Sequence, residues 1–290
     1  MRHRLPSRDK RSLGPFRVAP MGYGAMRLAG RGVFGPPPDR DEAIALLREA
    51  VHHGVDHIDT AAYYGPDVVN ELIRQALHPY SPELVLVSKV GARRDDRGGI
   101  FAADEPNQLR HGIEENLRSL GVDYVPVVNL RLMRAGPPDA FFDDQLAAMI
   151  AARDDGLIAA IGLSNVTVAH LVRALAFTDV ACVQNSYHLG DRRSQPVLDE
   201  CGRRGIAFVP FAPLGSGGTG ERSVLDAPKL ALIATRLGVQ PAEVALAWLL
   251  HVAANMLLIP GTSSRLHLRD NLAAATLRLD DEAMRELSVL

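Results

Sequence analysis

Ionisable side chains stand at the ends of three apolar runs in this sequence. Asp59 ends the run VDHID and Tyr64 follows it, Lys89 ends LVLVSK, and Arg131 ends VVNLR. A phenol with its ordinary pKa near ~10 is a poor acid, but a neighbouring ammonium group favours the phenolate. If Asp59 keeps Lys89 charged and aimed, Lys89 would lower the pKa of Tyr64 and prepare it to protonate a developing alkoxide. The residue types therefore indicate general acid chemistry.

The same residues also fit a purely structural interpretation. Asp59 and Lys89 could form a buried ion pair that locks two strands together, with Tyr64 hydrogen-bonded at the rim. Tyr63 is the rival phenol, and sequence periodicity does not choose between it and Tyr64. Arg131 could pair with a loop carboxylate, as arginines often do. The choice depends on whether the fold brings these strand ends together.

Short apolar runs recur along the chain, with amphipathic stretches between them. Near-continuous apolar strands that alternate with helices are typical of a parallel sheet whose outer face is covered by helices. The count predicts an α/β fold, a single (β/α)8 TIM barrel, in which functional side chains come from different strand ends at one mouth. Asp59, Lys89, Arg131 and Ser164–Asn165 would converge there. The eight runs are APMGYGA, VDHID, LVLVSK, YVPVVNLR, IAAIGLS, ACVQNSY, IAFVPF and MLLIPG.

The chain is predicted to be one domain with short additions at both ends. Residues 1–13 are expected to form a flexible basic arm and residues 14–290 the barrel, with GPFRVAP as a turn or hairpin before the first strand. SSRLHLRDNLAAA and DDEAMRELSVL predict two additional C-terminal helices, and Asp39 with Glu42 predicts a capping box on the first helix. Other helices are expected at about residues 67–77, 105–119, 139–153, 166–176, 191–203 and 226–237.

Composition and charge exclude several classes of partner. Of the 290 residues, 47% are hydrophobic and 23% charged, the balance of a globular chain with a large buried core. The formal net charge of −2 argues against nucleic acid or an anionic membrane as partner. No signal core follows the basic start and no apolar run approaches the ~20 residues that span a bilayer, so a cytoplasmic protein, compatible with a monomer, is expected. Cys182 and Cys201 are expected to be a buried thiol and a helix-surface thiol, neither of them catalytic.

Several segments together resemble the aldo-keto reductase family. DTAAYYG is similar to its D-T-A-x-x-Y-G motif, VSKV to its lysine strand, GLSN to its nicotinamide-amide motif, VQN to its glutamine strand, and IPGTSSRLHLRDN to its cofactor-binding end. The resemblance covers nearly all residues from Val18 onward. It implies Tyr64 rather than Tyr63 as proton donor, with Asp59 and Lys89 in supporting roles. No side chain supplies a hydride, so a nicotinamide cofactor is expected, with its C4 facing the substrate carbonyl.

The cofactor site follows from the same resemblance and from helix chemistry. Residues 261–263 precede a helix whose N-terminal N–H groups form a natural anion site. His267 stands where many relatives carry an arginine against the 2′-phosphate, and Arg265 or Arg269 could add charge, so NADPH is expected and NADH is less favoured. The implied cofactor-binding residues are Gly24, Ser164, Asn165, Gln184, Phe211, Leu214, Gly215, Ser216, Gly261, Thr262, Ser263, His267, Asp270 and Asn271.

Arg131 departs from the common pattern of the family, in which a histidine hydrogen-bonds the substrate carbonyl. Arginine is larger, permanently charged and only a donor, so Arg131 could stabilise a developing oxyanion or grip an anionic or oxygen-rich substrate. GYGAMRLAGRGVFGPP, KVGARR, VVNLR and CVQN resemble a bacterial subgroup that includes pyridoxal reductases and carries arginine at this place. Met26, Phe34 and Tyr63 are expected to line the substrate pocket together with Arg131.

The resulting hypothesis is a reductase that converts a small-molecule aldehyde or ketone to an alcohol, with hydride from NADPH, a proton from Tyr64 and pyridoxal as candidate substrate. Three alternatives stay open: a specialised biosynthetic ketoreductase, an NADPH-binding regulatory subunit with little turnover, and a metal-dependent barrel hydrolase. The last would use His52, His53 and His57, but the first two end a helix and do not share the strand periodicity of His57, so no metal is expected.

Overall fold

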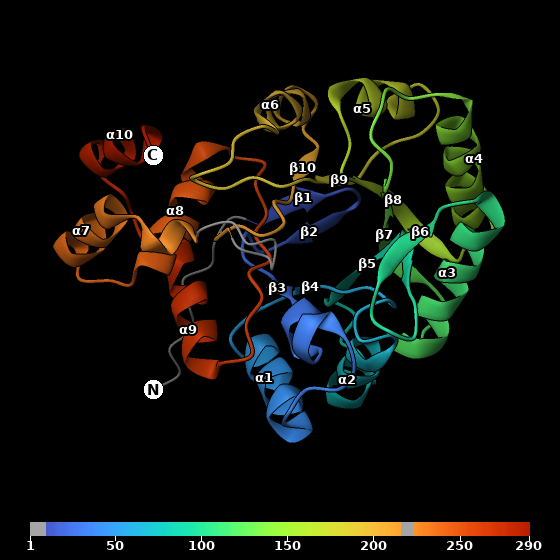
Figure 1. Cartoon of the computed structure of the whole chain (residues 1–290), viewed down its shortest axis with the longest axis horizontal. Helices are drawn as coiled ribbons and strands as arrows, with labels where there is room; N and C mark the ends of the chain where they lie inside the picture. The colour runs from blue at the N-terminus through green and yellow to red at the C-terminus, as the bar shows by residue number, and fades with distance from the viewer. Residues whose placement is uncertain (1–9, 216–222) are drawn as a thin grey trace.

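The centre of the structure, a computed structural model that describes residues 10–215 and 223–290, is a ring of parallel strands (Figure 1). A segment around Leu258 takes the eighth position, because it bridges β10 on one side and Met21, just before β3, on the other. This closure confirms the predicted barrel. The other seven strands, in their order of pairing, are β3 (Tyr23–Gly24), β4 (His57–Asp59), β5 (Val85–Arg94), β7 (Val125–Arg131), β8 (Ile158–Ser164), β9 (Cys182–Gln184) and β10 (Ala207–Phe208).

Alternation along the strands separates two apolar layers. On β5, Val85 and Val87 belong to the layer inside the barrel, whereas Leu86 and Val90 belong to the layer between the strands and the helices. Side chains alternate with a period of two along a strand, so the next inward position after Val87 is Lys89. The same alternation turns the polar residues at the carboxyl ends of the other strands into the barrel mouth.

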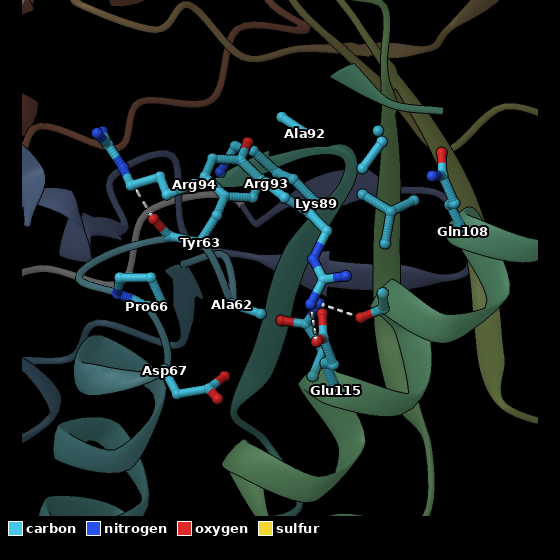
Figure 2. Close-up of a pocket in the computed structure, with 15 residues that line it drawn as sticks. Ala62, Tyr63, Pro66, Asp67, Lys89, Ala92, Arg93, Arg94, Gln108 and Glu115 are labelled. Atoms are coloured by element: carbon cyan, nitrogen blue, oxygen red, sulfur yellow. Dashed lines mark hydrogen bonds and ion pairs between the residues drawn. The ribbon is translucent and has the colours of Figure 1, made fainter. Parts of the chain in front are cut away.

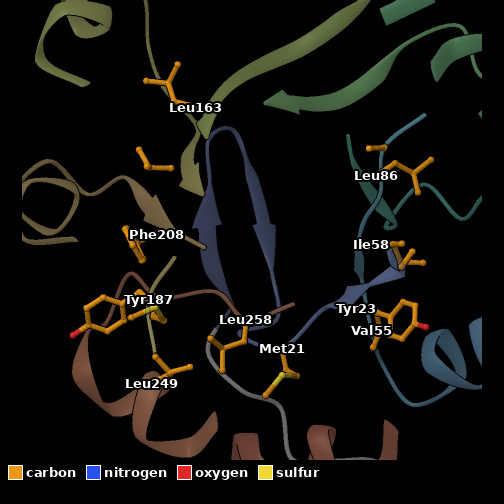
Figure 3. Packing of buried hydrophobic residues seen from close by; sticks show 14 of the residues in the cluster. Met21, Tyr23, Val55, Ile58, Leu86, Leu163, Tyr187, Phe208, Leu249 and Leu258 are labelled. Atoms are coloured by element: carbon orange, nitrogen blue, oxygen red, sulfur yellow. The ribbon is translucent and has the colours of Figure 1, made fainter. Parts of the chain in front are cut away.

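A β-hairpin closes the opposite end of the barrel and lies at the centre of Figure 3, among the buried side chains. β1 (Arg11–Leu13) and β2 (Phe16–Val18) pair antiparallel, and the last residue of each strand is buried in the inner apolar layer. Gly14 turns the hairpin with a φ of +56°, which glycine adopts without steric cost. Strand β1, which falls within the segment expected to be the basic arm, therefore packs against the inside of the barrel through Leu13, while residues 1–9 lie outside the described residues.

Helices cover the outer face of the barrel in chain order (Figure 1). Among the described residues, none of the helices is by itself long and apolar enough to cross a membrane, and α7 with α8 passes that test only as a pair bent by 92°. α6 begins later than residue 191, because the Asp191 side chain accepts hydrogen bonds from Arg193 and forms a turn there. The helices are α1 (Arg40–His52), α2 (Val68–Leu77), α3 (Pro106–Leu120), α4 (Ala140–Asp154), α5 (Val168–Leu175), α6 (Gln195–Arg204), α7 (Pro228–Leu237), α8 (Pro241–Val252), α9 (Arg265–Ala273) and α10 (Asp281–Ser288).

The predicted capping box on α1 is only half formed. Asp39 caps the helix as expected, accepting a hydrogen bond of 2.8 Å from the Glu42 backbone N–H. The Glu42 carboxylate is instead paired with Arg265 of α9 at 2.7 Å. A charge-assisted, two-pronged arginine contact is stronger than a bond to a backbone N–H, and its partner lies far away in the sequence.

A second hairpin, which was not predicted from the sequence, extends from the barrel mouth. The end of β5 pairs antiparallel with β6 (Ile100–Ala103). Asp95 shapes the turn by accepting hydrogen bonds from the backbone N–H groups of Arg97 and Gly99. The turn residues DDRGG are a signal that predicts such a hairpin. Arg94 ties the hairpin to the loop after β4, donating to the Tyr63 carbonyl at 3.1 Å.

Candidate active site

Polar side chains occupy the inward positions at the carboxyl ends of five neighbouring strands. Strand register places Arg131 beside Ser164, and Ser164 beside Gln184. Asp59 and Lys89 stand on β4 and β5, which also pair directly. The strand ends therefore meet as the sequence predicted.

The Asp59 carboxylate accepts hydrogen bonds from two other strands. Lys89 donates from Nζ to Oδ1, and Gln184 donates from Nε2 to Oδ2 at 2.6 Å. Lys89 Nζ also donates to the Thr60 carbonyl at 3.1 Å. The side chains are buried, so the pair needs these additional hydrogen bonds to offset its loss of hydration. The arrangement holds the ammonium group in one position.

Tyr64 lies in the loop after β4, with its ring against Lys89. The Lys89 Nζ atom lies 5.2 Å from the centre of the ring. Burial raises the pKa of the Tyr64 phenol and the charge of Asp59 raises it further, while Arg131 and Arg94 lower it. Burial outweighs the lowering by the two arginines, so the pKa of Tyr64 lies above its ordinary value, whereas the sequence had led us to expect a lowered one. The phenol is thus protonated at neutral pH, as a proton donor must be.

Arg131 points its guanidinium group toward the mouth. Its Cζ lies 5.9 Å from the centre of the Phe211 ring, and its Nε is buried with no hydrogen-bond partner among the described residues. Its charge lowers the pKa of both Tyr63 and Tyr64 against the opposing effect of burial. These contacts leave a donor of permanent charge beside the phenols, which suits a ligand oxygen better than the loop salt bridge considered from the sequence.

Other buried atoms without a hydrogen-bond partner among the described residues include Ser164 Oγ, Gln184 Oε1 and the Tyr63 hydroxyl. Buried polar groups are normally paired, so a ligand is a natural partner. A hydroxyl that donates and an amide oxygen that accepts would together satisfy a carboxamide, so the residues fit a nicotinamide. Asn165 differs from expectation: its backbone is left-handed at φ 62° and its Nδ2 donates to the Leu132 carbonyl at 2.9 Å.

Two glycines bring the first strand close to the segment before α9. A Cβ atom at Gly24 would lie 2.4 Å from the carbonyl oxygen of Ile259, and one at Gly261 would lie 2.6 Å from that of Gly24. Tyr23 secures the contact by donating from Oη to the carbonyl of Thr262 at 2.6 Å. Residues 261–263 are therefore held at the edge of the mouth.

The loop after β10 supplies the other expected cofactor contacts. Leu214 is partly buried against the core. Gly215 has a φ of +71°, and its N–H donates to the Ala212 carbonyl at 2.9 Å. Ser216 lies outside the described residues.

The start of α9 carries the remaining residues expected at the cofactor. Ser264 caps the helix by accepting from the backbone N–H of His267, whose side chain is exposed. About one helical turn after His267, Asp270 is half-buried and Asn271 is buried. These positions are compatible with an adenosine phosphate at the helix N-terminus.

The two arginines of α9 are bound to α1. Arg265 pairs with Glu42 and Arg269 with Glu49, each at 2.7 Å. Both arginines are partly exposed, but each is paired with a carboxylate. Their effect is to neutralise two carboxylates that would otherwise repel an anion beside His267.

Of the expected pocket walls, Tyr63 lines a small pocket on β5. Figure 2 shows a pocket of about 70 Å³ between the Tyr63 loop, β5 and α3, with Tyr63 and Arg94 in its lining. Met26 and Phe34 do not line this pocket. Phe34 lies against the turn of the β5–β6 hairpin, where a Cβ atom at Gly98 would be 3.1 Å from its ring.

Neither cysteine is placed for nucleophilic chemistry. Cys182 is buried inside the barrel, and burial raises the pKa of its thiol. Cys201 is also fully buried, with burial raising its pKa to about 12. The expectation of a helix-surface thiol at Cys201 is therefore wrong: the inner face of α6 covers it, and the i, i+4 spacing to Val197 marks that face.

The histidines of the metal hypothesis are separated. His52 and His53 end α1, whereas His57 is buried on β4 with its Nδ1 3.4 Å from Asp56 Oδ1. Within residues 10–215 and 223–290, no group of three or more potential metal ligands comes together.

Comparisons with known proteins agree with this geometry. The family model described as "Aldo/keto reductase family" matches residues 20–290. The chain is 45% identical over 279 residues to a pyridoxine 4-dehydrogenase of Escherichia coli, covering 95% of this chain and 96% of that protein. It is 35% identical over 276 residues to an uncharacterized oxidoreductase of Schizosaccharomyces pombe, covering 95% and 87%.

Solved structures give the same picture. The thermostable aldo-keto reductase Tm1743, in complex with the inhibitor epalrestat, superposes with a TM-score of 0.81 at 28% identity, covering 97% of this chain and 98% of that one. An aldo-keto reductase of Klebsiella pneumoniae in complex with NADPH has a TM-score of 0.80 at 25% identity, covering 97% and 95%. The chain belongs to the aldo/keto reductase family of oxidoreductases.

Proposed function

We propose that this enzyme reduces an aldehyde or ketone to an alcohol with NADPH, and that pyridoxal is its substrate. The observation that carries the proposal is the buried Asp59–Lys89 pair beside a protonated Tyr64, with the unpaired Ser164 Oγ and Gln184 Oε1 next to it. One set of groups suits proton donation and the other suits a carboxamide.

In this proposal Tyr64 donates the proton and Lys89 and Asp59 position it. A bound reduced nicotinamide supplies the hydride. Tyr64 can give its proton to a developing alkoxide, which is a stronger base than a phenolate even where burial has raised the phenol pKa. Arg131 stabilises the growing negative charge with its buried, unpaired Nε–H.

The choice of pyridoxal rests on the E. coli relative and on Arg131. That relative is a pyridoxine 4-dehydrogenase, and pyridoxal is the aldehyde that corresponds to pyridoxine oxidised at its 4-substituent. Pyridoxal also carries a ring hydroxyl beside the aldehyde, so a donor-only guanidinium can bind both oxygens.

The choice of NADPH over NADH rests on the start of α9 and on one solved relative. The Klebsiella pneumoniae structure contains NADPH. Helix N-termini favour phosphate, and the pairing of Glu42 and Glu49 with arginines removes repulsion near His267. A 2′-phosphate at this place would meet a more favourable field than the sequence alone suggested.

Loss of reduced-nicotinamide absorbance tests the proposal. Purified protein should oxidise NADPH when pyridoxal is added, faster than with aliphatic aldehydes and faster than with NADH as donor. Tight NADPH binding without turnover of any carbonyl in a broad panel would overturn it and favour the regulatory subunit. Turnover of a ketone but not of pyridoxal would support NADPH-dependent carbonyl reduction and reject pyridoxal as the substrate.

A further inference from the structure

A buried cluster of hydroxyl and amide side chains lies between the barrel and the helices α2 and α3. We call it the amide–hydroxyl cluster. It lies on the outer side of β4 and β5, away from the mouth, and the mechanism above does not use it. Its members are at most 5% exposed: Thr60, Asn70, Ser88, Asn116 and Ser119.

The cluster is internally complete. Thr60 donates to Asn70 Oδ1 at 2.7 Å, and Ser88 donates to Asn116 Oδ1 at 2.5 Å. Asn70 Nδ2 donates both to Asn116 Oδ1 at 3.0 Å and to Ser119 Oγ at 2.9 Å. Asn116 Nδ2 donates to the Gly112 carbonyl of α3 at 2.8 Å, and Ser119 Oγ donates to the Glu115 carbonyl of α3 at 2.7 Å.

Two members of the cluster are direct chain neighbours of the proposed catalytic pair. Thr60 follows Asp59, and Ser88 precedes Lys89. Because successive side chains of a strand point to opposite faces, Thr60 and Ser88 point outward to the cluster while Asp59 and Lys89 point into the barrel. Thr60 connects the cluster directly to Lys89. Its hydroxyl donates to Asn70 of the cluster, and its backbone carbonyl accepts a hydrogen bond from Lys89 Nζ at 3.1 Å. Its N–H donates to the Val87 carbonyl at 2.8 Å and ties the two strand ends together.

The polar composition of the cluster needs an explanation beyond packing. Apolar side chains of similar size would fill the same space and hold α2 and α3 at least as firmly, because a buried polar network must first lose its hydration. A fully satisfied network instead permits only one set of side-chain directions. It therefore fixes orientation where apolar contacts allow sliding.

We propose that four members of the amide–hydroxyl cluster, Thr60, Ser88, Asn70 and Asn116, form a positioning device for the proposed reaction, whereas Ser119 only holds the far end to α3. The device fixes the Thr60 carbonyl and the Ser88 backbone, and thereby aims the Lys89 ammonium at Tyr64. The inference rests on the proposed function. Thr60 and Ser88 are positioning residues that act through Lys89, and Asn70 and Asn116 are the links that carry the constraint from α2 and α3.

Conservative variants test this proposal. Thr60→Val and Ser88→Ala each remove one hydroxyl next to the pair, and Ser119→Ala removes one at the far end of the same cluster. Because small misplacements of catalytic groups are costly, kcat should fall about tenfold or more in the first two variants, with the Kd for NADPH nearly unchanged. The solvent deuterium isotope effect on kcat should rise as proton transfer becomes limiting. Thr60→Ser, which keeps the donor, should restore kcat.

Ser119→Ala is the matched control. It should lower the melting temperature as much as the other two variants while leaving kcat and the isotope effect unchanged. Equal losses of kcat in all three variants, or no loss in Thr60→Val and Ser88→Ala, would overturn the proposal.

Hydrogen exchange separates this proposal from the proposed function. The Thr60 amide should exchange faster in Thr60→Val and Ser88→Ala but not in Ser119→Ala, whether or not any carbonyl is reduced. A wild type without turnover would reject the proposed function alone, and unchanged exchange at Thr60 would reject the positioning role alone.

Discussion

Gln184 donates a hydrogen bond of 2.6 Å to Asp59, from β9 to β4, two strands that are not neighbours in the sheet. The other atom of the same amide, Oε1, is buried without a partner among the described residues. One side chain thus links the buried ion pair to the proposed nicotinamide site.

Replacing Gln184 should weaken cofactor binding. In Gln184→Leu, Asp59 Oδ2 loses its donor and the carboxamide loses its acceptor, each a hydrogen bond worth about 1 kcal/mol. Because the carboxamide bond is the one that the cofactor makes, the Kd for NADPH, measured by quenching of protein fluorescence, should rise about fivefold. Cys182→Ala, two residues earlier on the same face of β9, is the control, and an equal Kd in both variants would contradict the role of Gln184.

Tyr64→Phe should remove most turnover. Loss of a general acid typically costs about 10²–10⁴-fold in rate, while the ring and its contact with Lys89 remain. The matched control is Tyr63→Phe, which removes the neighbouring phenol and should keep kcat within about threefold. Steady-state kinetics with pyridoxal measures kcat for both variants. A larger loss of kcat in Tyr63→Phe than in Tyr64→Phe would assign proton donation to Tyr63.

The free energy of unfolding should depend on pH in the alkaline range. Burial raises the pKa of Tyr23, Tyr63 and Tyr64 in the folded protein. Below a pH of about 10 these phenols are neutral in both the folded and the unfolded state. Above it they ionise only in the unfolded chain, so the folded state binds more protons and the free energy of unfolding falls as the pH rises. Urea unfolding should give constant stability up to about pH 9 and a steady decline above about pH 10. Tyr64→Phe should make the decline shallower, and an unchanged slope would argue against burial of a neutral phenol there.

Arg131→Met should change substrate preference more than cofactor binding. Removing a charge-assisted hydrogen bond costs about 1.5–3 kcal/mol, so kcat/KM for pyridoxal should fall about ten- to hundredfold. Pyridine-4-carboxaldehyde, which lacks the neighbouring ring hydroxyl, should lose less. Arg134→Met serves as the control, since Arg134 is exposed and pairs with Asp104. Equal losses of kcat/KM for both aldehydes would mean that Arg131 binds the carbonyl oxygen and not the ring hydroxyl.

Arg265→Ala should weaken NADPH binding selectively. The substitution leaves the Glu42 carboxylate without its partner near the start of α9, where it would repel a 2′-phosphate. The ratio of Kd values for NADPH and NADH should rise about threefold to tenfold at low salt and less at high salt. An equal change in Kd for NADPH and NADH would mean that the 2′-phosphate does not bind near the start of α9.

The sequence by itself determined the barrel, its strand ends and the identity of the polar residues there. Each strand is a short apolar run, and the period-two alternation that turns Val85 and Val87 inward also turns Lys89 inward. The start of α1 could also be predicted, because a cap such as Asp39 acts on its own backbone, whereas the start of α6 could not. These are local effects, so the order of residues contains them.

Only the tertiary structure decided how Glu42 pairs and how burial acts on the phenols. Burial raises the pKa of Tyr64 and the charge of Asp59 raises it further, where proximity to a lysine had suggested the opposite. Glu42 pairs with Arg265 across 223 positions of the chain instead of closing its own capping box. Such outcomes depend on distances between segments remote in sequence and on the exclusion of water, and both exist only once the barrel has closed.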